Sequence, residues 1–366
     1  MAEREGFEPS IRFCRILTFQ ASAFDHSATA PHCAGKVGAL TARPPFRKVP
    51  LRGRLDAMRI PALLLLGAAS AAIAQSPKPA TAPALAPSEI VAAAPTADWQ
   101  DIAPADLLVM DLAPDAKGKP RRVIIQLMPP PFSQGWVGNI RKLAAAHWWD
   151  GTAIVRVQDN YVVQWGDPDG EDKAKAKPLP PGLAVVPQGD YRTPRYARFA
   201  TWLSWMKDAN YAAHVGFKTG WPVGGDGAHS WPVHCYGMVG VGRNLSPDTG
   251  TGAELYTVIG HAPRHLDRNI ALVGRVISGI EQLSSLPRGT GALGFYEKAE
   301  ERVPILAVRL GNEVAGLPRY QYLSTESASF ARYAHARANR RDAFFIRPAG
   351  GADICNIPVP IRQAPN

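Results

Sequence analysis

Short runs of apolar and β-branched residues, separated by turn signals, dominate the chain from residue 122 onward. The run 122–128 predicts a strand that ends at three consecutive prolines. Helical spacing of apolar residues follows Ser133 and recurs over 197–206 and 278–286. Many short strands with few helices predict a β-barrel or sandwich rather than a βαβ array. The other predicted strands are 152–157, 161–164, 238–241, 255–259, 270–276 and 303–310.

The first 104 residues fall into three segments of distinct composition. In residues 1–57 the apolar residues follow neither the 3.6-residue period of a helix nor the 2.0-residue period of a strand. We expect this segment to be a spurious upstream extension without a fold. Residues 58–74 combine a basic start, an apolar run from residue 60 and an Ala-Ile-Ala end, a pattern typical of a secretory signal peptide. The alternative, a buried helix, is disfavoured because prolines follow at once. Residues 75–104 are Ala/Pro-rich and predict a linker without a core.

Composition and charge exclude several classes of protein. Glycine and proline together supply 67 of 366 residues, a smaller share than the roughly 25–30% of low-complexity chains. The formal net charge is +10, but residues 1–74 carry half of it, and no run of Lys or Arg longer than two follows residue 75. We therefore expect no nucleic-acid partner. The apolar run 60–74 is too short to span a bilayer comfortably, so no stable membrane span is expected. Because residues 58–74 match a signal peptide, the protein is expected in the periplasm or otherwise exported.

Motifs that suggest a cofactor or a metal do not fit their context. Residues 289–294 match G-x-G-x-x-G, but dinucleotide binding needs a strand before the motif and a helix after it, so we interpret the segment as a turn. His229, His234 and Cys235, with His214 as a fourth candidate, match no zinc spacing, and the histidines are interpreted as solvated loop residues. No cofactor and no metal are expected. Whether Cys235 and Cys355 form a disulfide or stay buried thiols is left open by the sequence.

Six motifs in order resemble those of the cyclophilin-type peptidyl-prolyl cis-trans isomerases. The most specific, D-G-T-A-I-V-R-V-Q-D-N-Y-V-V-Q-W-G-D-P, begins at Asp150, after the predicted strand 122–128 and its following helix. Further matches lie at 237–240, 252–256, 265–267 and 273–276. The resemblance implies a mainly β fold over 105–310, a closed eight-stranded antiparallel barrel capped by two helices. It leaves 171–234 as a long insertion and 311–366 as a C-terminal appendage.

The resemblance also implies a site for isomerising X–Pro bonds in Pro-containing polypeptides. The barrier is amide resonance, about 18–20 kcal/mol, so the reaction needs no nucleophile and no cofactor. Arg156 stands at the family's catalytic arginine, whose hydrogen bond strengthens only as the bond twists, and Gln164 stands at the glutamine that orients it. By itself, Arg156 would be interpreted as a surface charge on a strand. The residues at the family's substrate-pocket positions are Tyr161, Val162, Glu254, Tyr256, His265 and Leu266.

Departures from the family pattern keep a second function open. Gly240 replaces an asparagine and Glu254 a glutamine, both of which bind the substrate backbone in the family. We also expect Glu254 to pair with Arg156, and Arg156 to contribute little to stability. One interpretation is an isomerase that assists the folding of exported proteins. The alternative is a non-catalytic or weakly catalytic Pro-peptide-binding module, or a holdase chaperone.

The appendage has its own predicted elements. A helix is predicted from Thr325 to about Arg341, capped by Ser324, with acidic and basic ends that suit the helix dipole. A short strand is predicted over 343–346. The apolar stripe of the helix is thin, so we expect it to dock on the outside of the barrel, away from Arg156. The alternative is a lid that contributes Tyr320 and Tyr322 to the site.

Overall fold

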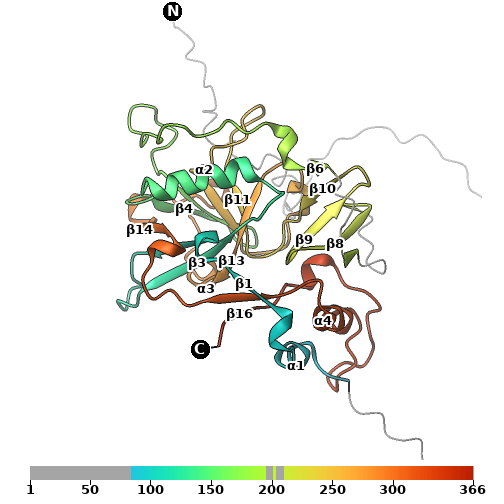
Figure 1. The fold of residues 1–366 in the computed structure, drawn as a ribbon. Coiled ribbons are helices and arrows are strands. Elements are labelled where there is room, and N and C mark those ends of the chain that lie inside the picture. The colour runs from blue at the N-terminus through green and yellow to red at the C-terminus, as the bar shows by residue number, and fades with distance from the viewer. Residues whose placement is uncertain (1–83, 195–200, 203–209, 366) are drawn as a thin grey trace, which may run out of the picture. The chain divides into compact units, whose positions relative to one another are not determined.

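The fold is a closed barrel of antiparallel strands with two smaller sheets beside it, as the computed structural model shows (Figure 1). It describes residues 84–194, 201–202 and 210–365. The strand order β11-β12-β5-β4-β14-β2-β3-β13 closes on itself and confirms the expected eight-stranded barrel. The barrel strands are β2 (Leu107–Leu112), β3 (Arg121–Leu127), β4 (Ala153–Val157), β5 (Val162–Gly166), β11 (Met238–Val241), β12 (Leu255–Val258), β13 (Leu272–Ser278) and β14 (Val303–Leu310).

Alternation of side chains along the strands explains how the barrel buries both of its faces. On β2, Leu108 and Met110 point into the main core, whereas Leu107 and Val109 belong to a second apolar cluster on the outside. Helix α2 (Gln134–Ala145) adds the fully buried ring of Trp136 to the main core, and the short helix α3 (Glu281–Ser284) adds Leu283. These two helices lie where the apolar spacing predicted them.

The insertion 171–234 contains a second sheet of five antiparallel strands in the order β6-β10-β9-β8-β7. Of the helix predicted over 197–206, only Thr201 and Trp202 lie in the described residues, and they form a strand. The rest of that prediction lies outside the described residues. The strands are β6 (Thr193–Pro194), β7 (Thr201–Trp202), β8 (His214–Lys218), β9 (Trp221–Gly225) and β10 (His229–Pro232).

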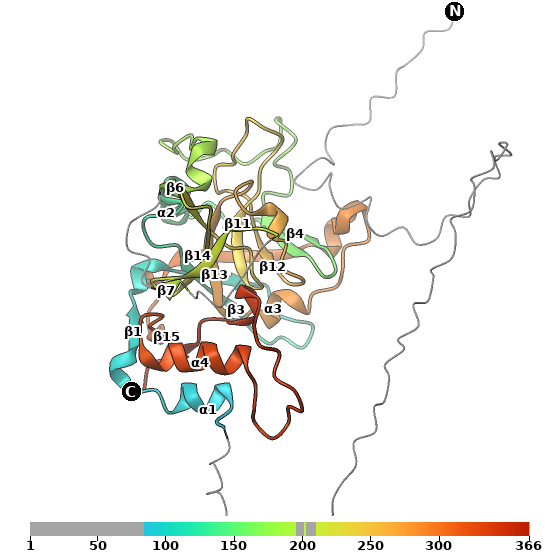
Figure 2. The same cartoon turned by 90° about the vertical axis from the view of Figure 1, so that its right-hand side faces the viewer.

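A third sheet joins the start of the described chain to the appendage. Strand β1 (Trp99–Ile102) pairs with β15 (Tyr320–Leu323), which also pairs with β16 (Ile361–Gln363). Helix α1 (Pro87–Ala92) lies beside α4 (Ala328–Ala338), as both Figure 1 and Figure 2 show. The segment 87–104 thus departs from the expected linker, because Ile90, Trp99 and Ile102 are buried.

The appendage also departs from its predicted boundaries. Helix α4 is capped by Ser327, which accepts a hydrogen bond from the amide of Phe330, and not by Ser324. The strand predicted over 343–346 does not form, since Asp342 closes a turn with Phe345 and no strand pairs with these residues. Tyr320 lies in the outer apolar cluster with Leu107 and Val109, so the appendage covers β2 and β3.

The remaining described elements are short 3-10 helices, and the leader segments are not described. Residues 1–57 and the predicted signal peptide 58–74 lie outside the described residues. Among the residues that are described, no helix has the length and apolarity needed to cross a membrane. The 3-10 helices are η2 (Thr96–Asp98), η3 (Pro104–Asp106), η4 (Gln188–Tyr191), η5 (Arg264–Leu266), η6 (Ala292–Gly294), η7 (Ala299–Glu301), η8 (Gly311–Glu313) and η9 (Ile354–Asn356).

Candidate active site

Arg156 lies on β4 and is fully buried, with an exposed fraction of 0%. Its Nε donates to the carbonyl of Leu293 at 2.7 Å, and its Nη1 donates to Oε1 of Gln164 at 3.0 Å. Its Nη2 donates to Gln158. Burial lowers the pKa of Arg156 to about 10, so the guanidinium is still charged at neutral pH. A side chain held this firmly is part of the packed structure, so its contacts favour a larger contribution to stability than the sequence suggested.

The local geometry of β4 turns Arg156 toward β5. The register between β4 and β5 shifts between Ile154 and Arg156, which marks a β-bulge. Bulges of this kind redirect side chains beside functional sites. Ile154 and Val157 both point into the main core, whereas Arg156 lies opposite Gln164 on the neighbouring strand.

Gln164 connects Arg156 to Glu254. While Oε1 of Gln164 accepts from Arg156, its Nε2 donates to Oε1 of Glu254. The carboxylate of Glu254, which we expected to pair with Arg156, is thus linked to it through the side chain of Gln164. Gln164 is also the β5 residue directly opposite Tyr256 on β12, so β4, β5 and β12 bring the donor, its orienting amide and a pocket aromatic together.

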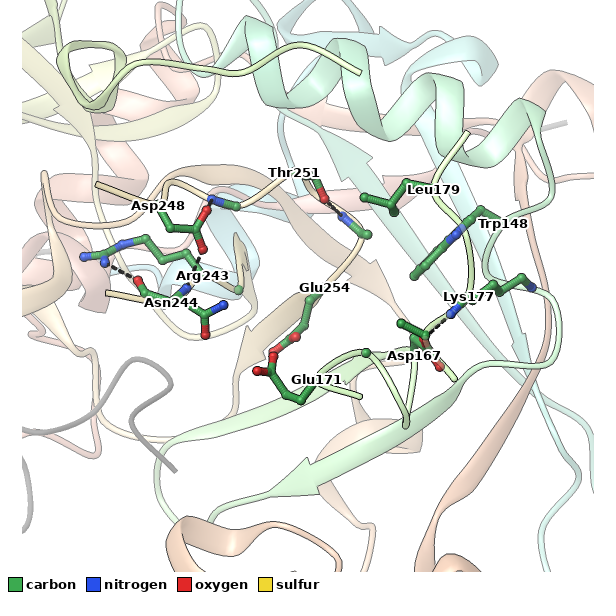
Figure 3. A pocket seen from close by; sticks show the side chains of 15 residues that line it. Trp148, Asp167, Glu171, Lys177, Leu179, Arg243, Asn244, Asp248, Thr251 and Glu254 are labelled. Carbon is green, nitrogen blue, oxygen red and sulfur yellow. Dashed lines mark hydrogen bonds between the residues drawn. The ribbon is translucent and has the colours of Figure 1, made fainter. Parts of the chain in front are cut away.

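Glu254 also lines an open cavity of about 280 Å³ (Figure 3). Figure 3 shows its side chain directed toward Glu171 in the middle of this cavity, with Arg243 and Asp248 on one side and Lys177 with Trp148 on the other. The lining mixes both charge signs with apolar surface, which suits a polypeptide more than a small apolar ligand. Because Glu254 binds Gln164, this cavity adjoins the Arg156 network.

Four of the predicted pocket residues form one compact apolar cluster. Tyr161, Val162, Tyr256 and Leu266 pack together with Val258 and Ile270, separately from the main core. The ring centre of Tyr161 lies 5.7 Å from Cζ of Arg156, so the cluster adjoins the guanidinium. His265 lies on the exposed side of η5, where its pKa is lowered by partial burial and then by the neighbouring His234. The structure brings the other predicted residues together and leaves His265 at the edge.

A buried polar chain behind the cluster involves residues that sequence reasoning did not find. Nε2 of His234 lies 2.9 Å from the hydroxyl of Tyr256, and Nδ1 lies 2.9 Å from Oδ1 of Asp267. Asp267 also accepts from Nε of Arg264 at 2.7 Å. Burial by itself raises the pKa of Asp267, but the hydrogen bonds and charges of His234 and Arg264 outweigh it and hold that pKa below its usual value.

His234 lies in a loop but is fully buried, so its interpretation as a solvated histidine is wrong. The signal that would have pointed to it is the hydroxyl of Tyr256. Tyr256 stands where the resembling family has phenylalanine, and most buried hydroxyls have a partner, although that of Tyr161 has none among the described residues. The described residues contain no group of three or more His, Cys, Asp or Glu side chains arranged to hold a metal ion.

The G-x-G-x-x-G segment packs against β4 beside Arg156. Phe295 forms an isolated bridge with Arg156, and its ring centre lies 5.1 Å from the guanidinium carbon. Gly294 has a φ of +78°, and a Cβ there would lie 2.7 Å from Cα of Gln158. The glycines allow this close approach of two backbones, in agreement with the turn interpretation. Residues 289–295 thus form the cover over Arg156, and we refer to them as the covering loop.

The two cysteines that the sequence left open form a disulfide. Cys235 and Cys355 are bonded, with their Cα atoms 5.1 Å apart. Cys235 directly follows His234, so the bond fixes the end of the appendage to the chain beside the pocket.

Comparison with known proteins identifies both the family and the fold. The sequence model of the family described as cyclophilin type peptidyl-prolyl cis-trans isomerase/CLD matches residues 135–310, a span that includes every predicted site residue. The crystal structure of cyclophilin AquaCyp293 from Hirschia baltica matches with a TM-score of 0.54 and 20% identity, covering 73% of this chain and 95% of that one. This similarity supports the barrel fold.

Two further comparisons add little. A cyclophilin type peptidyl-prolyl cis-trans isomerase from Cryptosporidium parvum matches with a TM-score of 0.33 and 11% identity, over 56% of this chain and 96% of that one, which is too distant to carry an argument. The search of curated proteins found no match.

Proposed function

The chain belongs to the cyclophilin-type peptidyl-prolyl cis-trans isomerase family through residues 135–310, and we propose that it isomerises X–Pro bonds in exported proteins with Arg156 at the reacting bond. One observation carries the role of Arg156. A charged donor, oriented by Gln164, directly adjoins the apolar cluster of Tyr161, Val162 and Tyr256. Once uncovered, the cluster would offer an apolar surface to a prolyl ring, and the guanidinium would offer a hydrogen bond to the prolyl nitrogen.

The chemistry follows from the way an X–Pro bond rotates. As the amide twists, resonance is lost and the prolyl nitrogen regains its lone pair, which then accepts a hydrogen bond. A donor that binds this twisted nitrogen more strongly than the planar amide lowers the barrier. Arg156 has five N–H groups, and three of them donate to Leu293, Gln164 and Gln158. The others remain for the substrate.

Access to Arg156 requires a movement of the covering loop. The loop holds Arg156 through the carbonyl of Leu293 and the ring of Phe295. We propose that a bound substrate displaces this loop, so that the described arrangement corresponds to a closed state. Displacement costs the Leu293 hydrogen bond, and the new bond to the substrate offsets that loss.

The same burial supports a second candidate function. The guanidinium of Arg156 is fully covered and the pocket residues Tyr161 and Tyr256 are 2% and 1% exposed. If the covering loop rarely opens, the barrel binds Pro-containing chains through its outer surface without useful turnover. This is the binding module or holdase that the departures at Gly240 and Glu254 also favour.

A protease-coupled assay on a short X–Pro peptide separates the two functions. Arg275 provides a matched control, because it is also buried, burial lowers its pKa to about 9, and it binds Gln126 and the carbonyl of Gly220. Both Arg156→Ala and Arg275→Ala are expected to reduce stability. Only Arg156→Ala is expected to lower kcat/KM, by about 10²-fold in folded protein.

Two results would contradict the proposal. A parent protein that does not exceed the uncatalysed rate would favour the holdase. Equal kcat/KM in the parent and in Arg156→Ala would remove Arg156 from the mechanism. Arg156→Lys keeps the charge without the fork of donors, and is expected to recover only part of the activity.

Export is tested separately from catalysis. Cleavage after Ala74 would give a mature chain that begins at or near Gln75. Mass spectrometry of the protein from a periplasmic extract measures this N-terminus. Peptides from residues 1–57 in that extract would contradict both the proposed leader and the proposed spurious extension.

A further inference from the structure

A strongly exposed apolar tip follows helix α4. Phe344 is 85% exposed and Ile346 is 103% exposed, whereas Phe345 is partly covered. The ring of Phe345 packs at 5.2 Å against that of Phe344 and lies 4.3 Å from the guanidinium carbon of Arg340. Phe345 and Arg340 thus form the base of the tip, and the other two apolar side chains project from it.

The tip is surrounded by positive charge. Residues 328–350 contain five arginines and one acidic residue, Asp342, so their formal charge is +4. Asp342 is already paired with Arg340 at 2.6 Å. Arg341 and Arg347 flank the apolar side chains on either side in the sequence. We call residues 340–347 the basic tip.

An apolar groove lies beside the basic tip, between α1 and α4. Its cavity measures about 490 Å³. Apolar residues of its lining include Leu85, Ile90 and Ala331, and Arg332 and Arg341 add charged side chains. Figure 2 shows α1 and α4 next to each other, with the chain after α4 extending beyond them. Because Arg341 belongs to both features, the groove and the basic tip form one surface.

We propose that this surface docks on an anionic lipid bilayer. Phe344 and Ile346 would enter the interfacial region, while Arg341 and Arg347 would bind lipid phosphates. Exposed apolar side chains between arginines suit this boundary, since it offers acyl chains below and negative charge above. Each basic side chain can keep its charged head among the phosphates while its stem covers apolar surface.

The size of the apolar surface favours a bilayer over a second protein. Two side chains of this kind bury on the order of 300–400 Å², whereas a stable protein interface needs about 800 Å² on each partner. A bilayer needs no complementary shape, and its anionic phosphates attract the positive charge of the basic tip directly.

Vesicle co-sedimentation of the full chain tests the proposal. All variants would also carry Leu64→Glu and Leu66→Glu, which interrupt the apolar run 60–74, so that any binding comes from the remainder of the chain. The vesicles are phosphatidylcholine alone or mixed with phosphatidylglycerol. Phe344→Ser with Ile346→Ser is expected to lower the partition coefficient about tenfold or more. Arg341→Gln with Arg347→Gln is expected to lower it on the anionic vesicles only.

A matched control substitutes equally exposed apolar residues elsewhere. Leu245 and Leu306 are 58% and 55% exposed, so Leu245→Ser with Leu306→Ser is expected to leave binding unchanged. Equal partitioning of the basic-tip variants and their parent would overturn the proposal, as would equal binding to neutral and anionic vesicles. A loss of self-association by light scattering, with vesicle binding unchanged, would assign the surface to a second copy of the chain. Melting temperatures confirm that the variants stay folded.

Discussion

The hydroxyl of Tyr256 is held by His234, whose Nε2 lies 2.9 Å away. Asp267 determines the direction of this hydrogen bond. Its pKa is lowered, so it is a carboxylate at neutral pH and accepts from Nδ1 of His234. When the imidazole is neutral, Nε2 is then left as an acceptor, and Tyr256 donates to it. Burial raises the pKa of Tyr256 well above its usual value, so the hydroxyl keeps its proton.

Tyr256→Phe therefore separates stability from catalysis. The substitution leaves Nε2 of His234 without its partner in a buried place, which is expected to cost about 1–3 kcal/mol in the free energy of unfolding. The ring that adjoins the pocket is retained, so kcat/KM is expected to stay close to that of the parent. Urea unfolding and the peptide assay measure the two quantities. An unchanged free energy of unfolding would show that the hydrogen bond contributes nothing.

Asp267 makes the stability of the protein sensitive to acid. Because its folded pKa lies below its unfolded value, the ionised form is favoured by folding. The resulting stability is present above the unfolded pKa of about 4 and is lost as the pH falls through the lower, folded value. At pH 6, the free energy of unfolding of Asp267→Asn is expected to be about 3 kcal/mol below that of the parent. Between pH 6 and 3, the variant is expected to lose less stability than the parent does.

The melting temperatures of both proteins across this range provide the test. A variant whose stability falls with acid as steeply as that of the parent would place the acid sensitivity in other carboxylates. Asp111→Asn is a suitable control, because Asp111 forms an exposed pair with Arg122 on the outside of the barrel.

The sequence predicted most of the barrel because its strands carry local signals. The run 303–310 was predicted with the bounds that β14 has, and 122–128 differs from β3 by one residue at each end. Strand β1 was not predicted, because an Ala/Pro-rich segment gives no sign of a partner strand as distant as β15. The strand predicted at 343–346 did not form for the opposite reason: its composition suits a strand, but nothing pairs with it.

The predicted site differs from the structure in a similar way. Arg156, Gln164 and Tyr161 were identified from one continuous motif, and the structure brings them together. The motif gave no information on what covers them. Leu293 and His234 come from distant segments. Leu293 acts through its backbone carbonyl and His234 through its ring, and only the folded chain places these groups beside the site.

Removing the disulfide is expected to lower stability. Cys235 and Cys355 are separated by 120 residues, and a loop of this size corresponds to about 4–5 kcal/mol in the chain-entropy account. Cys235→Ala with Cys355→Ala is expected to lower the melting temperature clearly, and a reductant is expected to do the same to the parent. A parent that melts at the same temperature with and without reductant would contradict the prediction.

The appendage packs against the inserted sheet. Phe330 of α4 is fully buried, and its ring centre lies 4.9 Å from that of Phe217 on β8. Tyr322, a candidate for a lid, lies under the turn at Gly220, where an added Cβ would be 2.6 Å from the tyrosine ring. Thr325 accepts from the amide of Gly220. These contacts join the appendage to the inserted sheet.

Phe330→Ala is therefore expected to reduce stability without altering catalysis. Loss of a buried aromatic ring costs about 3–5 kcal/mol, and kcat/KM of the folded protein is expected to be unchanged for every peptide tested. Phe344→Ala is the control, because that ring is 85% exposed and its loss is expected to leave the melting temperature unaltered. Deleting residues 312–366 extends the test. A deletion variant with intact stability and a changed preference for the residue before proline would show that the appendage acts as a lid.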